Sequence, residues 1–223
     1  MWWHQVTIFG DVIVTGPAAL AILVWLLAGR LWRPAAAWIM LFGVGMLLVV
    51  VSKIAFIGWG IGSQSLDFTG LSGHAMRACA VMPVLAYLLA QGGAQRGWRI
   101  AGVIAGIGVG VLISVSRVML HAHSWSEVIS GGWLGVSVAL LFINMASSHD
   151  KPAFNAWLLL ASLLPLFWIS RGEPAPTQQL LTRVALRLSG HQQPYTRSRW
   201  APPVSLALAL AQNAAGAEML AAT

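Results

Sequence analysis

The sequence predicts an all-α fold, a bundle of six transmembrane helices over residues 1–170, followed by a C-terminal tail over residues 171–223. Hydrophobic residues make up 58% of the chain and charged residues only 9%, whereas a soluble domain carries roughly 25% charged residues. The apolar runs are continuous rather than alternating, and an open sheet cannot satisfy its backbone hydrogen bonds in lipid. Helices need ~20 residues to cross about 30 Å of hydrocarbon, and six apolar runs approach that length, at 9–29, 36–58, 74–92, 98–119, 127–146 and 154–170.

Small residues and prolines indicate how these helices pack. Gly102, Gly106 and Gly110 recur at four-residue spacing in the fourth run. This spacing predicts a close contact with another helix, because small residues let two backbones approach each other. Pro83 and Pro165 predict kinks in the third and sixth helices.

The tail contains one amphipathic segment, from Gln178 to Leu188. Arg183 and Arg187 lie opposite an apolar face that consists of Leu181, Val184, Ala185 and Leu188. This pattern is typical of a helix that lies in the membrane interface. The tail shows no chemical motif, so no site residue is expected in it.

Basic residues indicate how the helices are oriented. Cations between membrane spans mark the cytoplasmic side, and those after the first, third and fifth runs are Arg30, Arg33, Arg96, Arg99 and Lys151. The opposite loops, 59–73 and 120–126, contain no Lys or Arg. We therefore expect these two loops to face away from the cytoplasm.

Charge and cysteine content exclude several classes of function. The net charge of +7 is explained by membrane topology, and no basic face carries the interleaved aromatics of a nucleic-acid binder. Cys79 is the only cysteine, which excludes an intrachain disulfide and a cysteine-based metal site.

The first candidate site motif is Ser72-Gly73-His74, at the start of the third run. The first N–H groups of a helix lack partners and attract anions. Gly73 would allow close approach of the backbone, and Ser72 and His74 would stand beside the bound group. The alternative interpretation is that Ser72 is an N-cap and His74 an interfacial histidine.

The second motif is more specific and joins Ser116-Arg117 to His123 and Glu127. His123 and Glu127 are four residues apart, so they share one side of a first helical turn. A carboxylate there orients an imidazole and makes it a better nucleophile or base. Arg117 offers a guanidinium fork suited to phosphate, unless it is an arginine that snorkels to the interface. Glu127 also fits a capping box with Ser124, and the two roles are compatible.

Lys53 lies among apolar neighbours near the outer end of the second run. An ionisable group at membrane depth costs about 3 kcal/mol or more. Lys53 therefore either snorkels or meets an anion, and an anion at the same membrane face as the two motifs is favoured.

Together these residues resemble the membrane-bound type 2 phosphatidic acid phosphatases, the PAP2 family. The family's second motif, Pro-Ser-Gly-His, is matched by Leu71-Ser72-Gly73-His74. Its third motif, Ser-Arg, five residues, His, three residues and Asp, is matched by Ser116-Arg117, His123 and Glu127. The resemblance covers roughly residues 36–146 and implies a bundle of PAP2 type.

Two departures from the family pattern bear on the site. The first motif is a Lys followed seven residues later by Arg-Pro. Lys53 is present, but Gly60-Ile61 replaces the Arg-Pro pair. Arg77 lies on the same helical face as His74 and is a candidate substitute for the missing cation. Glu127 in place of Asp lengthens the carboxylate by one methylene.

The resemblance implies hydrolysis of a phosphomonoester or diphosphate in two steps, with no metal and no cofactor. His123 would attack phosphorus to form a phosphohistidine, Glu127 would hold the His123 imidazole, and His74 would protonate the leaving oxygen and then activate water. The phosphoryl oxygens would be bound by Lys53, Arg117, Ser72 and the Gly73 amide.

The substrate implied by the resemblance is a lipid phosphate at the outer leaflet of a bacterial inner membrane. Phosphatidic acid, phosphatidylglycerol phosphate and polyprenyl diphosphates such as undecaprenyl diphosphate all fit, and the loops favour none of them. The alternative is a catalytically silent protein of the same fold that binds or transports a lipid headgroup.

Overall fold

The computed structural model describes residues 2–91, 96–147 and 177–199. In these ranges the chain is helical, and an isolated bridge between Ser63 and Phe68 is the single β-type pairing. The predicted all-α fold is confirmed. The helices are α1 (Trp2–Ile8), α2 (Val12–Ala28), α3 (Trp32–Trp59), α4 (Gly73–Ala90), α5 (Arg96–Met119), α6 (Trp125–Ser147) and α8 (Thr177–Ser189), followed by the short 3-10 helix η1 (Arg197–Arg199).

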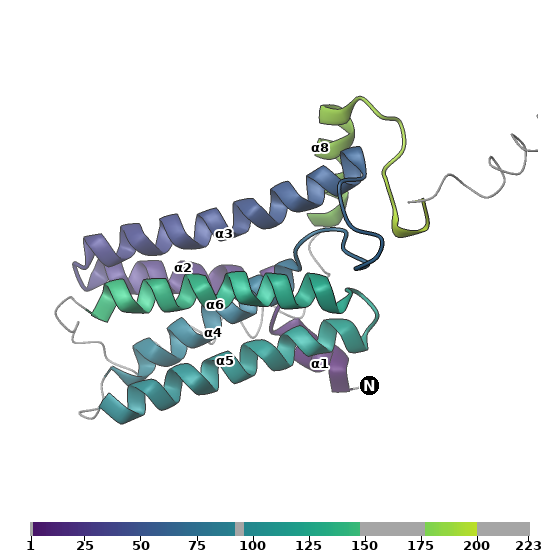
Figure 1. Cartoon of the computed structure of the whole chain (residues 1–223). Coiled ribbons are helices and arrows are strands. Elements are labelled where there is room, and N and C mark those ends of the chain that lie inside the picture. Colours follow the sequence, from purple (N-terminus) through teal and green to yellow (C-terminus); the bar gives the residue numbers. More distant parts are fainter. Residues whose placement is uncertain (1, 92–95, 148–176, 200–223) are drawn as a thin grey trace, which may run out of the picture.

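Five helical segments are long and apolar enough to cross a membrane when α1 and α2 are taken together. They correspond to the first five predicted runs, and Figure 1 shows the long helices lying lengthwise beside one another. The sixth predicted run, 154–170, lies outside the described residues. These helices indicate a multi-pass membrane protein.

The first predicted run, 9–29, begins at a break between two helices, and α1 lies before it. Phe9, Gly10 and Asp11 separate α1 from α2, and the Asp11 side chain caps α2 by accepting a hydrogen bond from the Ile13 amide at 3.1 Å. Asp is favoured at such an N-cap because its oxygen pairs an amide that has no partner within the helix. The break places α1 beside the C-terminal end of α5 (Figure 1).

Helix α4 is the most buried helix of the bundle and packs mainly against α5 and α6. A Cβ built on Gly106 would lie 2.6 Å from Pro83 Cα, and one on Gly110 would lie 2.9 Å from Cys79 Cα. On α6, a Cβ on Gly135 would collide with the carbonyl oxygen of Met76. The predicted close contact at the glycines of α5 is confirmed, and α4 is held between two glycine-lined helix faces.

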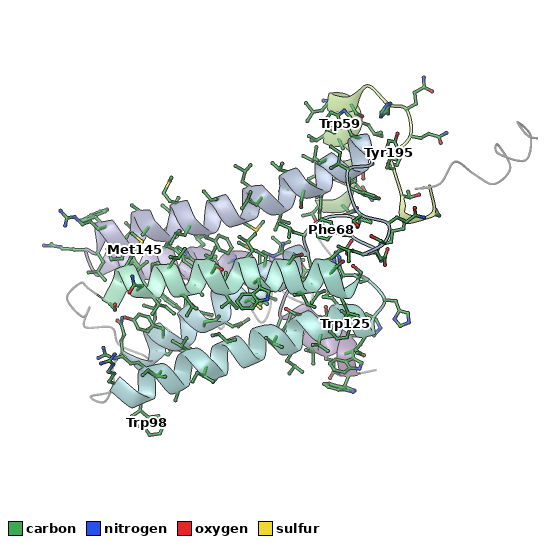
Figure 2. The ribbon with its side chains drawn as sticks, viewed as in Figure 1. Trp59, Phe68, Trp98, Trp125, Met145 and Tyr195 are labelled. Atoms are coloured by element: carbon green, nitrogen blue, oxygen red, sulfur yellow. The ribbon has the colours of Figure 1, made fainter. Side chains whose placement is uncertain are left out.

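Helix α8 covers the end of α3 that leads to the site. Ala185 is fully buried against Phe56 and Ile57 of α3, and Leu181 packs on the same cluster. Val184 and Leu188, from the same predicted apolar face, remain exposed. Figure 2 shows Tyr195 and Phe68 at this end of the bundle together with Trp125, while Trp98 and Met145 lie at the opposite end.

The packing of α5 on α4 predicts that alanine substitutions at two nearby glycines change thermal stability in opposite directions. Gly106→Ala inserts a methyl group against Pro83, and overpacking of this kind costs about 1–3 kcal/mol, so we expect a lower melting temperature in detergent. Gly108 has no atom within 4 Å of its built Cβ. Gly108→Ala is the matched control and should stabilise the protein slightly, since Ala is favoured over Gly within a helix by about 0.5–1 kcal/mol. Equal melting temperatures for the two variants would contradict the close contact.

Candidate active site

The predicted site residues come from four helices that meet at one end of the bundle. The Ser72 amide, at the start of α4, donates to the Glu127 carbonyl oxygen on α6 at 3.1 Å. The His123 amide donates to the Arg117 carbonyl oxygen, at the end of α5, at 3.3 Å. Lys53 on α3 lies against the loop that leads into α4, where its Cγ would be 3.2 Å from a Cβ on Gly70.

His123 and Glu127 form a close pair across the first turn of α6. His123 Nδ1 lies 2.5 Å from Glu127 Oε2. An ionised carboxylate only accepts hydrogen bonds, so Nδ1 carries the shared proton and Nε2 of the neutral imidazole keeps its lone pair. The predicted spacing thus produces an imidazole with its nucleophilic nitrogen directed away from the carboxylate.

The Glu127 side chain is fully buried, and its two oxygens are satisfied by groups from different segments. Oε1 accepts a hydrogen bond from the Thr69 amide at 2.7 Å and another from the Thr69 hydroxyl. The Ser124 amide is 3.4 Å from Oε2, and the Glu127 amide is 3.4 Å from the Ser124 hydroxyl. The capping box and the pairing with His123 therefore coexist, whereas the role of Thr69 was not predicted.

Burial controls the protonation of His123, which lies in the loop between α5 and α6. Burial lowers the pKa of His123 below its ordinary value of 6.5, and the hydrogen bond with Glu127 opposes that shift. The positive charges of Lys53 and Arg117 lower this pKa further. The imidazole is therefore neutral near pH 7, the form that has a free lone pair.

Ser72-Gly73-His74 occupies the first turn of α4, as predicted. The buried Ser72 hydroxyl accepts from the Ala75 amide at 3.4 Å and caps the helix. His74 Nε2 lies 3.5 Å from the Asp11 carboxylate, and both side chains keep partial exposure, 20% and 25%. Asp11 thus caps α2 and also gives His74 an acidic partner that the motif does not contain.

The basic side chains differ in how many of their hydrogen-bond donors already have a protein partner. Arg117 Nη1 donates to the Thr7 hydroxyl at 3.0 Å, but its Nε is buried and has no hydrogen-bond partner among the described residues. Lys53 is half-buried and makes no hydrogen bond or ion pair within the described ranges. A buried donor without a partner costs free energy unless a ligand satisfies it, so these two cations favour an anion site.

Arg77 is engaged with the break between α1 and α2. Its Nε donates to the Thr15 hydroxyl at 3.0 Å and its Nη2 to the Gly10 carbonyl at 3.2 Å. The remaining Nη1 would be 3.0 Å from a Cβ on Gly73. Arg77 therefore ties α4 to the first two helices and directs one nitrogen toward the start of α4.

Arg197, in the tail, reaches the same carboxylate. Its Nη2 lies 2.7 Å from Glu127 Oε2, and its Nη1 lies 3.3 Å from Asp67 Oδ2. The tail, which carries no chemical motif, thus contacts one of the predicted site residues. No local sequence pattern links Arg197 to either motif, because the contact depends on the packing of the tail against α3.

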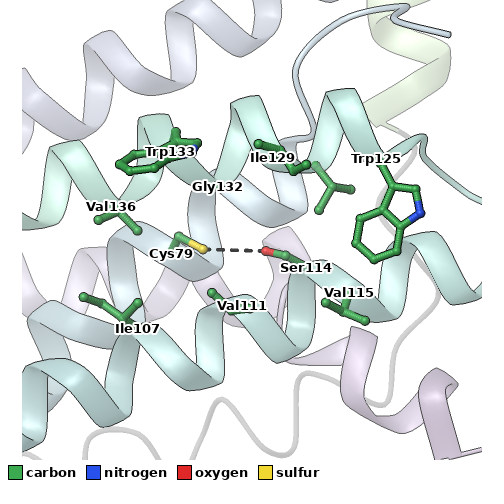
Figure 3. Close-up of a pocket in the computed structure, with 11 residues that line it drawn as sticks. Cys79, Ile107, Val111, Ser114, Val115, Trp125, Ile129, Gly132, Trp133 and Val136 are labelled. Atoms are coloured by element: carbon green, nitrogen blue, oxygen red, sulfur yellow. Dashed lines mark hydrogen bonds between the residues drawn. The ribbon is translucent and has the colours of Figure 1, made fainter. Parts of the chain in front are cut away.

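An apolar groove of about 340 Å³ opens between α5 and α6, close to the site (Figure 3). Trp125, at one end of the groove, and Trp133 are both more than half exposed on the outside of the helices. Deeper in the groove, Cys79 Sγ lies 3.6 Å from the Ser114 hydroxyl. Among the described residues, no three His, Cys, Asp or Glu side chains converge on a point that could hold a metal ion.

Comparison with known proteins identifies the family of this chain. The sequence model of the PAP2 superfamily matches residues 52–151. The chain belongs to the PAP2 superfamily. Superfamily membership supports a phosphatase-type activity, and the matched range contains Lys53, both motifs and the Glu127 pair.

Two relatives match the chain to different extents. An uncharacterized 22.5 kDa protein in the cps region of Klebsiella pneumoniae is 36% identical over 203 residues, which cover 89% of this chain and 97% of that protein. Phosphatidylglycerophosphatase B of Bacillus subtilis strain 168 is 36% identical over 87 residues, 38% of this chain and 41% of that protein. No solved structure gives a significant match.

The unpaired Arg117 Nε predicts measurable binding of an oxyanion. We expect orthovanadate to bind the detergent-purified protein, and Arg117→Gln to weaken that binding roughly 10- to 100-fold, because a hydrogen bond to a charged group contributes about 1.5–3 kcal/mol. Titration calorimetry measures the two dissociation constants. Arg183→Gln is the matched control, since Arg183 is exposed on α8 and should leave binding unchanged. Equal affinities for the Arg117 variant and the wild type would remove Arg117 from the anion site.

Proposed function

We propose that this protein is a membrane phosphatase that hydrolyses a lipid phosphate or lipid diphosphate through a phosphohistidine intermediate. The observation that carries the proposal is the His123–Glu127 pair, with a Nδ1 to Oε2 distance of 2.5 Å and a fully buried carboxylate. Membership of the PAP2 superfamily supports the phosphatase class.

In the first step, His123 Nε2 attacks the phosphorus atom and the bond from phosphorus to the lipid oxygen breaks. His74, as imidazolium, gives its proton to the leaving oxygen, and the Asp11 carboxylate at 3.5 Å stabilises its positive charge. Glu127 accepts the Nδ1 hydrogen bond and so stabilises the positive charge that develops on the His123 ring.

In the second step, His74 is neutral and takes a proton from water as the water oxygen attacks the phosphohistidine. The P–N bond breaks, inorganic phosphate leaves and His123 returns to its starting form, while His74 is protonated again. Each proton given in the first step is thus recovered in the second, as general acid–base catalysis requires.

The phosphoryl oxygens would be bound by Lys53, Arg117, the Ser72 hydroxyl, the Gly73 amide and Nη1 of Arg77. Charge on these oxygens increases in the transition state, and preorganised donors of this kind are each worth about 3 kcal/mol. No metal and no cofactor is required by this scheme, because cationic side chains supply the charge.

The lipid part of the substrate would lie in the apolar groove between α5 and α6, whose exposed tryptophans face outward. Loops 59–73 and 120–126 lack Lys and Arg, which supports a site at the periplasmic face of a bacterial inner membrane. Phosphatidic acid, phosphatidylglycerol phosphate and undecaprenyl diphosphate are the candidate substrates.

The proposal predicts phosphate release that depends on His123 and survives EDTA. The detergent-purified protein is assayed with the three lipid substrates, beside His123→Asn and the matched control His121→Asn. His121 is exposed two residues upstream and has a positive φ of 54°, a conformation that Asn tolerates. We expect His123→Asn to lose at least roughly 10³-fold in kcat, in line with loss of a nucleophile, and His121→Asn to retain wild-type activity.

If folded protein that still binds orthovanadate releases phosphate from none of the lipids, the proposed phosphatase activity is contradicted. That result would favour the headgroup-binding alternative. Release that stops with EDTA and returns with a divalent cation would contradict the metal-free scheme alone.

The lowered pKa of His123 predicts the pH profile of the enzyme. Protonation removes the nucleophile, so kcat/KM falls at acid pH, and the midpoint of that fall should lie below 6.5. Glu127→Gln removes a negative charge that favours the imidazolium, so the remaining activity should fall at a still lower pH, with kcat strongly reduced. A wild-type midpoint at or above 6.5 would contradict the assignment of His123 as the buried nucleophile.

A further inference from the structure

We propose that the C-terminal segment Gly190–Arg199, here called the strap, completes the active site by holding Arg197 against Glu127 as a positioning residue for the His123–Glu127 pair. This inference rests on the proposed function, because it assigns a role within that reaction. It makes the tail a part of the catalytic unit.

The strap is fixed to the C-terminal end of α3 by contacts with the backbone carbonyls of that helix. His191 Nδ1 lies 2.8 Å from the Gly58 carbonyl oxygen, and the Tyr195 amide donates to the Ile57 carbonyl oxygen at 2.9 Å. The His191 and Tyr195 rings meet edge to face, with their centroids 5.9 Å apart. These contacts set the path of the chain two residues before Arg197.

At position 60, the arginine of the family's first motif and the Tyr195 ring of the strap would occupy the same space. Gly60 has φ +70°, and a Cβ built on it would lie 2.8 Å from Tyr195 Cδ1. A side chain at position 60 would therefore be strained in its backbone and would collide with the tyrosine ring. The arginine that the first motif has at this position is incompatible with the docked strap, and the strap brings a different arginine to the site.

Arg197 acts on the carboxylate that orients His123. Its Nη2 and His123 Nδ1 share the same oxygen, Glu127 Oε2, at 2.7 Å and 2.5 Å. The Thr69 groups hold the other oxygen, so the carboxylate is fixed from both sides. A charge that is fully buried must be paired. Among the described residues, Arg197 supplies the cation that forms an ion pair with Glu127, whereas His123 donates a hydrogen bond from a neutral ring.

Arg197 is also held in place by Asp67, which has a positive φ of 49° in the loop before α4. The Arg197 side chain keeps 38% exposure, so it faces the solvent side of the site rather than the helix core. The loop, the strap and the first turn of α6 are thereby joined through one guanidinium group.

The test compares Arg197→Gln and Arg197→Lys with the matched variants Arg187→Gln and Arg187→Lys. Arg187 lies on α8, is exposed, and forms no ion pair within the described residues. Phosphate release from phosphatidic acid, phosphatidylglycerol phosphate and undecaprenyl diphosphate is measured for the full-length proteins from pH 4 to 9, and melting temperatures establish that each variant is folded.

We expect Arg197→Gln to lower kcat roughly 10- to 100-fold, the effect of one hydrogen bond to a charged group, with KM changed by less than about threefold. Arg197→Lys should recover part of kcat, because it restores the charge without the fork. The acid midpoint of kcat/KM should rise in Arg197→Gln, since one cation beside the pair is removed while Lys53, Arg117, His74 and Asp67 remain. Both Arg187 variants should match the wild type.

If kcat, KM and the acid midpoint of Arg197→Gln all match the wild type, the strap contact is structural only and this inference is overturned, while the proposed function stands on the wild-type activity. If the folded wild type releases phosphate from none of the lipids, the proposed function fails and the inference fails with it.

Discussion

A single buried carboxylate, that of Glu127, organises the end of the bundle where the candidate active site lies. An uncompensated charge in an apolar interior costs several kcal/mol, so the fold must bring donors to it. They come from separate segments: Thr69 from the loop before α4, His123 from the loop before α6, and Arg197 from the strap. The Ser72 amide joins the same region through the Glu127 carbonyl. These contacts fix the loop before α4, the loop before α6 and the strap around one charge.

The bundle provides a rigid support for that carboxylate. Helix α4 packs closely between α5 and α6 because Gly106, Gly110 and Gly135 present no side chains to it. Gly131 extends this contact to the site, where a Cβ would lie 2.6 Å from the Ser72 carbonyl oxygen. The first turn of α4 and the first turn of α6 are therefore held at a short, fixed separation, as two parts of a phosphate site require.

The sequence predicts the features that depend on local spacing. The all-α fold follows from continuous apolar runs, and the His123–Glu127 pair follows from a four-residue spacing at the start of a helix. The position of Asp11 beside His74, by contrast, depends on how α1 and α2 pack near α4. Thr69 and Arg197 also lack a local signal. Their contacts with Glu127 are set by tertiary packing, so no pattern of residues near either one indicates them.

The proposed reaction requires a covalent bond between His123 and the phosphoryl group, and this intermediate can be trapped. The purified protein is mixed with ³²P-labelled phosphatidic acid, or with another of the three lipids if that one is turned over, and quenched in alkali within milliseconds. We expect label that is stable in alkali, lost in acid, located on the peptide containing His123, and absent from His123→Asn. Rapid turnover with no protein-bound label, or label on a different residue, would exclude His123 as the nucleophile.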